Sequence, residues 1–374
     1  MAYSRQAARS DPAPSGSASG IGSGALEVRA LQAGEEAAWT SYVVAHPDAT
    51  LYHTLPWRDV VHKVFGHQAR YLLAARGSEI AGVLPLFLVR VPLLGAKLIG
   101  LPYDIGSGGP LAGDSETDAA LVRAGMELAE QLRVDYLELR LGGSRESLDT
   151  LGLVRSHPVV ISDMDLAEGE KVWSQVSTDN RQSIRKARNR GVKVRQAESL
   201  ADCDAFYQVY LRAFRDFGTP PYGRSYFPTV WRLLGASKGV RLLLAEVEGR
   251  IVGGSVLFCL GPNVVSKFAA CLPEAVPLRA YAALYGATID LALEARVRRL
   301  SWGTSATHQT GLIDFKRRWG AVGRPAALYA HPVRKVPPSV ERYYDETGLE
   351  RRLWKKLPVG LTPLAGGLLS RWFC

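Results

Sequence analysis

Apolar and polar positions follow two different periods along the chain, and together they predict a mixture of strands and helices. In the first part, helices are expected at 34–45, 52–65 and 116–132, and strands at 26–31, 69–74, 80–91, 96–101 and 135–140. Gly-Ser and Pro-Leu-Leu-Gly turns separate the three middle strands, which indicates an antiparallel meander. Pro56 stands at a favourable first-turn position of the second helix.

The second part repeats this order of elements. Helices are expected near 180–190, 201–215, 224–235 and 278–295, and strands at 240–247, 251–260, 263–270 and 298–302. A short basic helix around Lys316 and a strand at 326–331 follow. We therefore expect an α/β protein with two domains, 27–165 and 166–335, each a mixed and mostly antiparallel sheet flanked by helices. A disordered tail, 1–26, precedes them, and a basic and apolar tail, 336–374, follows.

Two matching hairpins support this duplication. Residues 74–83 and 245–254 share one pattern: a strand end, a tight polar turn, and Ile-x-Gly opening the next strand. An ordinary hairpin without further meaning is the alternative for each segment taken alone.

Composition excludes several protein classes. The 374 residues are 47% hydrophobic and 22% charged, which excludes a disordered chain and allows two buried cores. The net charge of +10 predicts an anionic partner, such as a nucleic acid, a phosphorylated substrate or an acidic membrane. We find no signal peptide and no apolar run long enough to span a bilayer, so a cytoplasmic protein is expected, with peripheral contact to the inner face of the plasma membrane as a further possibility.

Neither metal nor thiol chemistry is expected. The four Cys lack C-x-x-C spacing and the seven His are dispersed, so the sequence predicts reduced thiols and no metal site.

Positive charge is concentrated between residues 181 and 195, which hold seven cations and no acid. Arg181, Arg185 and Arg188 share one helical stripe, with Ile184 and Ala187 available for packing. Since Arg offers a planar fork of donors, this stripe predicts a track for phosphates of a tRNA, a nucleotide-linked sugar or a lipid pyrophosphate. A solvated helix paired with acids from elsewhere is the alternative.

The segment 310–320 places Phe315 and Lys316 on a short basic helix that follows an apolar strand. A ligand site is common at such a strand end, and a cation there can stabilise the oxyanion of an acyl transfer. His308 and Asp314 are the nearest candidates for accepting a proton. A solvated helix end with a buried Trp is the alternative.

Two loops supply further candidates for substrate contacts. The loop 217–227 is shaped by Gly and Pro and carries Tyr222, Arg224 and Tyr226; an ordinary helix connection is the alternative. The Gly-rich segment 102–110 follows a strand and can bind an anion through backbone amides, with Tyr103 and Asp104 as acceptor contacts. Trp57, with His53, can cover the same pocket, or it can pack in the core.

These segments carry a family resemblance. Phe315-Lys316 followed by Trp319-Gly320 resembles the signature of FemAB-like acyltransferases, which have two fused GNAT-type domains. The segments 50–57, 64–67, 81–86, 217–220 with 226–227, and 353–358 resemble a FemAB-related subgroup found with exopolysaccharide and exosortase systems, so the resemblance covers about residues 27 to 374. That subgroup has Asp-Phe-Gly-Arg-Ser where this chain has Ser-Trp-Gly-Thr-Ser, ending at Ser305, which puts the substrate and the activity in question.

The resemblance implies transfer of an aminoacyl or acyl group to an amine of a cell-envelope or exopolysaccharide precursor, with Lys316 and Phe315 in the catalytic site. No tightly bound cofactor is expected. Aminoacyl-tRNA is the expected donor, because residues 268–281 lack the glycines of an acetyl-CoA diphosphate loop. An acyl-CoA-dependent N-acyltransferase of an amino sugar and a non-catalytic binding protein of a polysaccharide pathway are the alternatives.

The basic and apolar C-terminal tail ends in Trp372-Phe373 and is too broken by Pro and Gly to span a bilayer. It can lie at an anionic membrane surface, which suits a lipid-linked acceptor, or dock on the protein itself.

Overall fold

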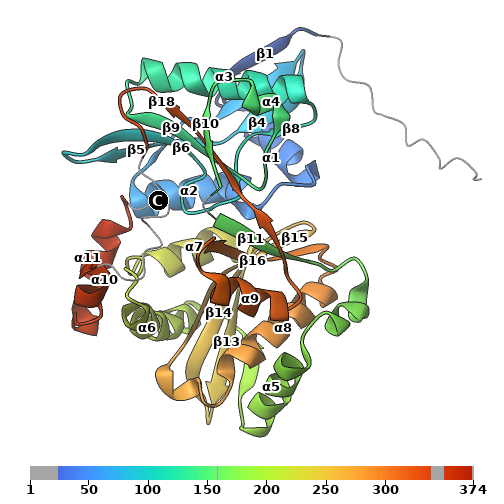
Figure 1. Cartoon of the computed structure of the whole chain (residues 1–374), viewed down its shortest axis with the longest axis vertical. Coiled ribbons are helices and arrows are strands. Elements are labelled where there is room, and N and C mark those ends of the chain that lie inside the picture. Colours follow the sequence, from blue (N-terminus) through green and yellow to red (C-terminus); the bar gives the residue numbers. More distant parts are fainter. Residues whose placement is uncertain (1–23, 158, 338–348, 373–374) are drawn as a thin grey trace, which may run out of the picture.

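A computed structural model describes residues 24–157, 159–337 and 349–372. Most of the expected tail 1–26, and residues 338–348 of the expected tail 336–374, lie outside these ranges. The chain forms two α/β halves, one above the other in Figure 1.

The first half holds two sheets. Their orders are β1-β3-β4-β8 and β10-β18-β9-β6-β5-β2, with β7 pairing on β9. The elements are β1 (Leu26–Ala30), α1 (Glu36–Ala45), α2 (Leu55–Phe65), β2 (Gln68–Ala69), β3 (Leu72–Arg76), β4 (Glu79–Leu84), β5 (Leu86–Val91), β6 (Gly95–Gly100), β7 (Ser107–Gly108), β8 (Leu111–Ala112), α3 (Ser115–Gln131), β9 (Tyr136–Leu141), α4 (Glu146–Asp149) and β10 (Val154–Ser156).

The second half holds one seven-stranded sheet, in the order β12-β13-β14-β15-β16-β11-β17. Its elements are β11 (Val159–Asp165), α5 (Thr178–Asn189), β12 (Lys193–Gln196), α6 (Leu200–Phe217), α7 (Tyr226–Leu234), β13 (Val240–Val247), β14 (Arg250–Leu260), β15 (Asn263–Cys271), α8 (Ala280–Glu294), β16 (Arg299–Ala306), α9 (Thr310–Arg318) and β17 (Val322–Pro325). The strand β18 (Ala327–Pro332) and the helices α10 (Leu349–Trp354) and α11 (Thr362–Leu369) follow.

Each predicted half gives one strand to the other. The strand β11, from the first predicted range, pairs with β16 and β17 in the second sheet. The strand β18, from the second range, returns to the first half, where it pairs with β9 and β10. Local pattern cannot predict this exchange, because pairing partners are set by the tertiary fold.

One predicted element was wrong. The run 80–91 was expected as a single strand of a meander, but it is divided at Pro85 into β4 and β5, which belong to different sheets. Proline has no N–H to donate to a ladder, so it favours such a break.

The two matching hairpins do form, and they share a deformation. In β3–β4 the register shifts between Ala74 and Ala75, and in β13–β14 it shifts between Ala245 and Glu246. Both shifts skip the residue after the Ile, so each hairpin contains a bulge at the same place. The structural duplication therefore extends to this irregularity.

Aromatic rings from both halves form one continuous core. Tyr52 and Trp57 of the first half pack on Phe258 of β14, with ring centroids 5.4 and 5.2 Å away. Tyr103 of the first half meets Tyr222 of the second half at 5.8 Å. The two halves are therefore joined by burial as well as by the exchanged strands.

Two glycines allow a close backbone approach beneath the 101–109 loop. A Cβ on Gly100 would overlap the carbonyl oxygen of Gly108, where β6 and β7 lie against each other. This contact holds the ends of the loop together, and the Tyr103 carbonyl within the loop accepts a hydrogen bond from Lys267 of the second half.

We predict that Gly100→Ala lowers the free energy of unfolding by about 2 kcal/mol or more, because the added methyl must displace backbone. Urea denaturation measures the change. Gly113→Ala is the matched control, since nothing lies within 4 Å of its added Cβ. Equal effects of the two substitutions would contradict this account of the loop.

Candidate functional site

A cavity of about 1570 Å³ lies between the two halves. The strands β15 and β16 pair in parallel only over 263–265 and 299–301, and their following residues line the cavity. The 103–109 loop, the end of β9 and the C-terminal helices complete the lining. Divergence of two parallel strands opens a wedge between them, which is a usual place for a ligand.

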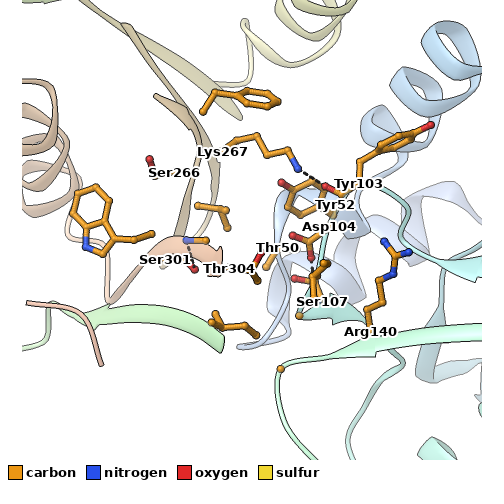
Figure 2. A pocket seen from close by; sticks show the side chains of 18 of the residues that line it. Thr50, Tyr52, Tyr103, Asp104, Ser107, Arg140, Ser266, Lys267, Ser301 and Thr304 are labelled. Atoms are coloured by element: carbon orange, nitrogen blue, oxygen red, sulfur yellow. Dashed lines mark hydrogen bonds between the residues drawn. The ribbon is translucent and has the colours of Figure 1, made fainter. Parts of the chain in front are cut away.

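Lys267 of the second half reaches to the loop of the first half that carries Tyr103 and Asp104, and all three residues line the cavity (Figure 2). The Lys267 ammonium donates a hydrogen bond to the Tyr103 carbonyl and lies 5.4 Å from the centroid of the Tyr52 ring. Burial lowers the pKa of Lys267 to about 8, although the Asp104 carboxylate opposes this shift. The Lys267 ammonium therefore loses its proton more readily than the ammonium of an ordinary lysine.

Burial also changes Asp104. It raises the pKa of this carboxyl group, while Lys267 and two hydrogen bonds from Ser107 oppose the change. One of these bonds runs from the Ser107 amide to Asp104 Oδ2 at 3.0 Å. A carboxylate with a raised pKa is a better proton acceptor than an ordinary surface aspartate.

The loop that carries Asp104 is strained. Tyr103 has a φ of 71°, in the left-handed region that non-glycine residues rarely adopt. Its ring stacks on Phe65 with centroids 3.8 Å apart, and its hydroxyl lies 2.7 Å from His67 Nε2. These contacts compensate for the backbone conformation, which is typical of functional sites.

Five arginines also line the cavity, and four of them contact neighbouring groups as follows. Arg140 pairs with Glu138 at 2.5 Å, Arg145 with Asp118 at 2.5 Å, and Arg324 with Asp163 at 2.8 Å. Arg299 bonds Asn263 Oδ1 at 3.1 Å. Arg299 also lies 3.5 Å from Asp48, so each of these four guanidinium groups has an acidic partner. Lys267 and Arg351 are the further cations of the lining, and Asp104 is its further acid.

Lys316 lies one layer behind this cavity. Its side chain is 8% exposed, and its ammonium donates to the carbonyl of Thr304, a lining residue, at 2.8 Å. Burial lowers the pKa of Lys316 to about 8, and the Asp163 carboxylate opposes the shift. Lys316 therefore supports the wall through β16 and is not itself on the surface of the cavity.

The neighbours of Lys316 on α9 also lie away from the cavity. Phe315 packs on Tyr285, with ring centroids 5.6 Å apart, and Asp314 pairs with Arg317 at 3.1 Å on the exposed face. His308 is exposed in the turn before the helix.

Of the other predicted contacts, Tyr103, Asp104 and Tyr222 come together in the cavity wall. Trp57 and Tyr226 are fully buried in the aromatic core, and Ser305 is fully buried in β16. Arg224 is exposed outside the cavity lining. The loop 217–227 thus contributes one of its three candidates to the wall.

The helix α5 carries the predicted arginine stripe at the end of the second half that points away from the first half (Figure 1). Arg185 and Arg188 are exposed, whereas Arg181 bonds the Trp173 carbonyl at 2.9 Å. Ile184 packs on α8, where a Cβ on Gly286 would come within 2.9 Å of it. Of the seven cations between residues 181 and 195, Arg195 forms ion pairs with Asp202 and Glu246.

Sequence reasoning missed Lys267 and the lining arginines. The available signals were weak: a single Lys inside the apolar strand 263–271, and Glu138 and Arg140 on one face of an otherwise apolar strand. Charged residues are rarely buried unless they are paired or functional, so each is a candidate site residue. Glu138 and Arg140 are two residues apart on one strand, whereas the partners of Lys267, Arg145 and Arg324 lie far away in the sequence, so those contacts could not be predicted.

The segment before α8 differs from a diphosphate-binding loop. The amides of Ala275, Val276 and Arg279 donate to carbonyls within the segment itself, and Arg279 takes a left-handed φ of 67°. None of the residues 272–279 lines the cavity. Within the described ranges, no group of His, Cys, Asp and Glu is placed to hold a metal ion.

Comparisons with known proteins agree with this architecture. Residues 174–317 match the family model described as "Acetyltransferase (GNAT) domain". No curated protein matches the sequence. The crystal structure of FemX superposes with a TM-score of 0.68 at 14% identity, covering 82% of this chain and 98% of that one.

Two further structures are similar. The C-terminal domain of a putative lysylphosphatidylglycerol synthetase from Agrobacterium fabrum gives a TM-score of 0.57 at 13% identity, covering 79% of this chain and 91% of that one. L-PGS from Bacillus licheniformis superposes with a TM-score of 0.51 at 13% identity, covering 81% of this chain and 96% of that one. The expected fold is confirmed: this chain has a tandem GNAT-like α/β fold, and its second half matches an acetyltransferase family, which indicates an acyltransferase.

Proposed function

We propose that this protein transfers an aminoacyl or acyl group, from aminoacyl-tRNA, to an amine of a cell-envelope or exopolysaccharide precursor. The observation that carries the proposal is the proximity of Lys267 and Asp104, each of which shifts the pKa of the other, in a large cavity between two GNAT-like halves. The similarity in fold to FemX and to L-PGS supports the same proposal.

The pair suits the chemistry of this transfer. The acceptor amine attacks the ester carbonyl of the donor, so a C–N bond forms and an oxyanion develops. The Lys267 ammonium can stabilise that oxyanion, and the Asp104 carboxylate can accept the proton that the amine loses. When the tetrahedral intermediate collapses, the ester C–O bond breaks and the ribose hydroxyl leaves with a proton.

Two features favour a macromolecular donor over acyl-CoA. The amides of Ala275, Val276 and Arg279 before α8 are engaged within their own turn, so these three are not presented to a diphosphate. The exposed cations of α5 lie at the far end of the second half, where a long polyanion can contact them while its reactive end lies in the cavity.

In this proposal Lys316 positions the cavity wall. Its bond to the Thr304 carbonyl fixes β16 beside the wedge. The Ser-Trp-Gly-Thr-Ser stretch that departs from the related subgroup forms part of this wall, since residues 301–304 line the cavity. The departure is therefore placed to change which acceptor fits.

We predict that Lys267→Met lowers kcat for aminoacyl transfer by about 10²- to 10³-fold, as expected for loss of one oxyanion-stabilising group. Asp104→Asn should lower kcat and remove the acidic limb of its pH profile, on which the rate rises as the carboxyl group loses its proton. Transfer of radiolabel from aminoacyl-tRNA to an envelope extract is the measurement. The exposed Lys63→Met is the matched control.

Three outcomes separate the candidate functions. Transfer from aminoacyl-tRNA that is lost in Lys267→Met supports the proposal. If radiolabel is transferred to the extract only from acetyl-CoA, the protein is instead an acyl-CoA-dependent N-acyltransferase. Cells that retain the pathway with both Lys267→Met and Lys316→Ala would instead indicate a non-catalytic binding protein.

We predict a distinct pH dependence of stability for Lys316→Met. Because the folded pKa is about 8 and the ordinary value is 10.5, the unfolded chain binds more protons between these values, and stability rises with pH. The difference corresponds to roughly 3 kcal/mol across the whole window. Urea denaturation at several pH values should show a flatter profile for Lys316→Met than for wild type, while Lys63→Met should leave the profile unchanged.

We predict that Arg185→Glu with Arg188→Glu weakens tRNA binding and reduces its dependence on salt, since each lost phosphate contact removes about 0.7 to 0.9 from the logarithmic slope. Filter binding over a range of salt concentrations measures both. The exposed Arg123→Glu on α3 controls for a general loss of charge. An unchanged slope would place the tRNA elsewhere on the protein.

A further inference from the structure

The C-terminal helices have apolar side chains that are exposed and do not pack against the rest of the protein. In α11 the buried positions are Thr362 and Gly366, and Ser370 directly after the helix is also buried, whereas Leu364 and Leu368 are 72% and 55% exposed. A Cβ on Gly366 would overlap the backbone of Pro221, so this helix is docked closely on the 219–223 loop. The outward face is therefore apolar on a firmly seated helix.

Cations surround these leucines. Leu353 and Leu361 are 58% and 53% exposed, and Lys355 and Lys356 are exposed between them. From residue 351 to the end, the sequence holds no Asp or Glu. We call Leu353, Leu361, Leu364, Leu368, Lys355 and Lys356 the helical lip.

A second group with the same chemistry lies at the tip of the β5–β6 hairpin. Leu93 is fully exposed and Leu94 is 69% exposed. The neighbouring Lys335 ammonium donates to the Leu94 carbonyl at 3.0 Å, and Arg334 is exposed beside it, followed by Val336 at 73%. We call Leu93, Leu94, Arg334, Lys335 and Val336 the hairpin lip.

Both lips adjoin the lining of the cavity. Leu94 lines the cavity from the hairpin side, and Trp354, Leu369 and Ser370 line it from the helical side. Lys97 of β6 donates to the Trp372 carbonyl at 3.4 Å, which ties the two sides together. In Figure 1 the β5–β6 tip and the C-terminal helices lie on the same side of the molecule.

We propose that the two lips dock this protein on an anionic phospholipid bilayer, with the opening of the cavity against the headgroups. Exposed leucines can enter the boundary between headgroups and acyl chains, while adjacent lysines and arginines contact lipid phosphates. A protein-binding surface is the less suitable assignment, because Lys is depleted at such interfaces. No helix of the described residues is long and apolar enough to cross a membrane, so the docking is peripheral.

The docked orientation specifies the acceptor of the proposed reaction, and this part rests on the proposed function. An amphiphile can leave its acyl chains in the bilayer while its headgroup amine enters the cavity between the lips. The cations lining the cavity suit a phosphate next to that amine.

Co-sedimentation with phosphatidylcholine vesicles, with and without phosphatidylglycerol, tests the docking. Wild type should bind the anionic vesicles, and less tightly at high salt. Leu364→Ser with Leu368→Ser should weaken binding by about tenfold or more, and Lys355→Glu with Lys356→Glu by a similar factor. Leu93→Ser tests the hairpin lip separately.

Matched controls carry the same changes elsewhere. Val44→Ser on α1 alters a side chain that is 58% exposed, and Lys186→Glu with Lys193→Glu makes the same change in charge on α5 and β12. Both should bind vesicles as wild type does. Unaltered circular dichroism of the lip variants excludes unfolding as the cause of any loss.

Several results would overturn the docking. The proposal would be contradicted if wild type bound vesicles equally well with and without phosphatidylglycerol. It would also be contradicted if the lip variants bound vesicles as tightly as the controls. A dimer that dissociates on Leu364→Ser with Leu368→Ser would assign the lip to a second copy of the chain. If vesicles bind but no acceptor is ever modified, the docking stands and the proposed reaction fails. If the lip variants modify a water-soluble amine normally but lose activity on a vesicle-borne amine, both stand.

Discussion

The burial of aromatic rings between the two halves is the interaction on which the site depends. Tyr52 and Trp57 meet Phe258, and Tyr103 meets Tyr222, so each half completes its core with rings from the other. Such contacts are dense and directional, and they cannot slide without loss of packing. They fix the distance between the 103–109 loop and β15, and therefore the position of Asp104 relative to Lys267.

The same packing explains why two lysines with similar pKa values have different roles. Lys267 and Lys316 both lose hydration, and each has an aspartate nearby. Lys267 is on the surface of the cavity, held by a carbonyl of the opposite half. Lys316 is behind the surface, where it holds a carbonyl of its own half. The two lysines therefore differ in their exposure to the cavity and not in the size of their pKa shifts.

The sequence was most informative where structure is local. The long periodic helices α3, α6 and α8 and the hairpin β13–β14 were predicted within a few residues, because periodicity and turn chemistry act over short distances. Tyr103, Asp104 and Tyr222 were found because loops rich in Gly and Pro often carry function. The pairing of Asp104 with Lys267 joins residues 163 positions apart in the chain, and no local signal contains it.

The family signature and the structure gave different information about Lys316: the signature singled out the residue, and the structure showed where its side chain lies. The family signature singled out residues 315 and 316, and the structure places Lys316 against the wall that the departing stretch 301–304 forms. A motif identifies a position in the chain but not the direction in which its side chain points.

The exchange of β11 and β18 has a mechanical consequence. Many two-domain enzymes admit large substrates by swinging apart about a hinge, with the linkers absorbing the rotation. Here such a swing would pull at least one ladder out of register, because β11 is hydrogen-bonded into one sheet and β18 into the other, and only short segments join them to their neighbours. The exchanged strands therefore hold the two halves at a fixed separation, so a ligand of the cavity has to enter a preformed gap with only small movements of the loops at its edge.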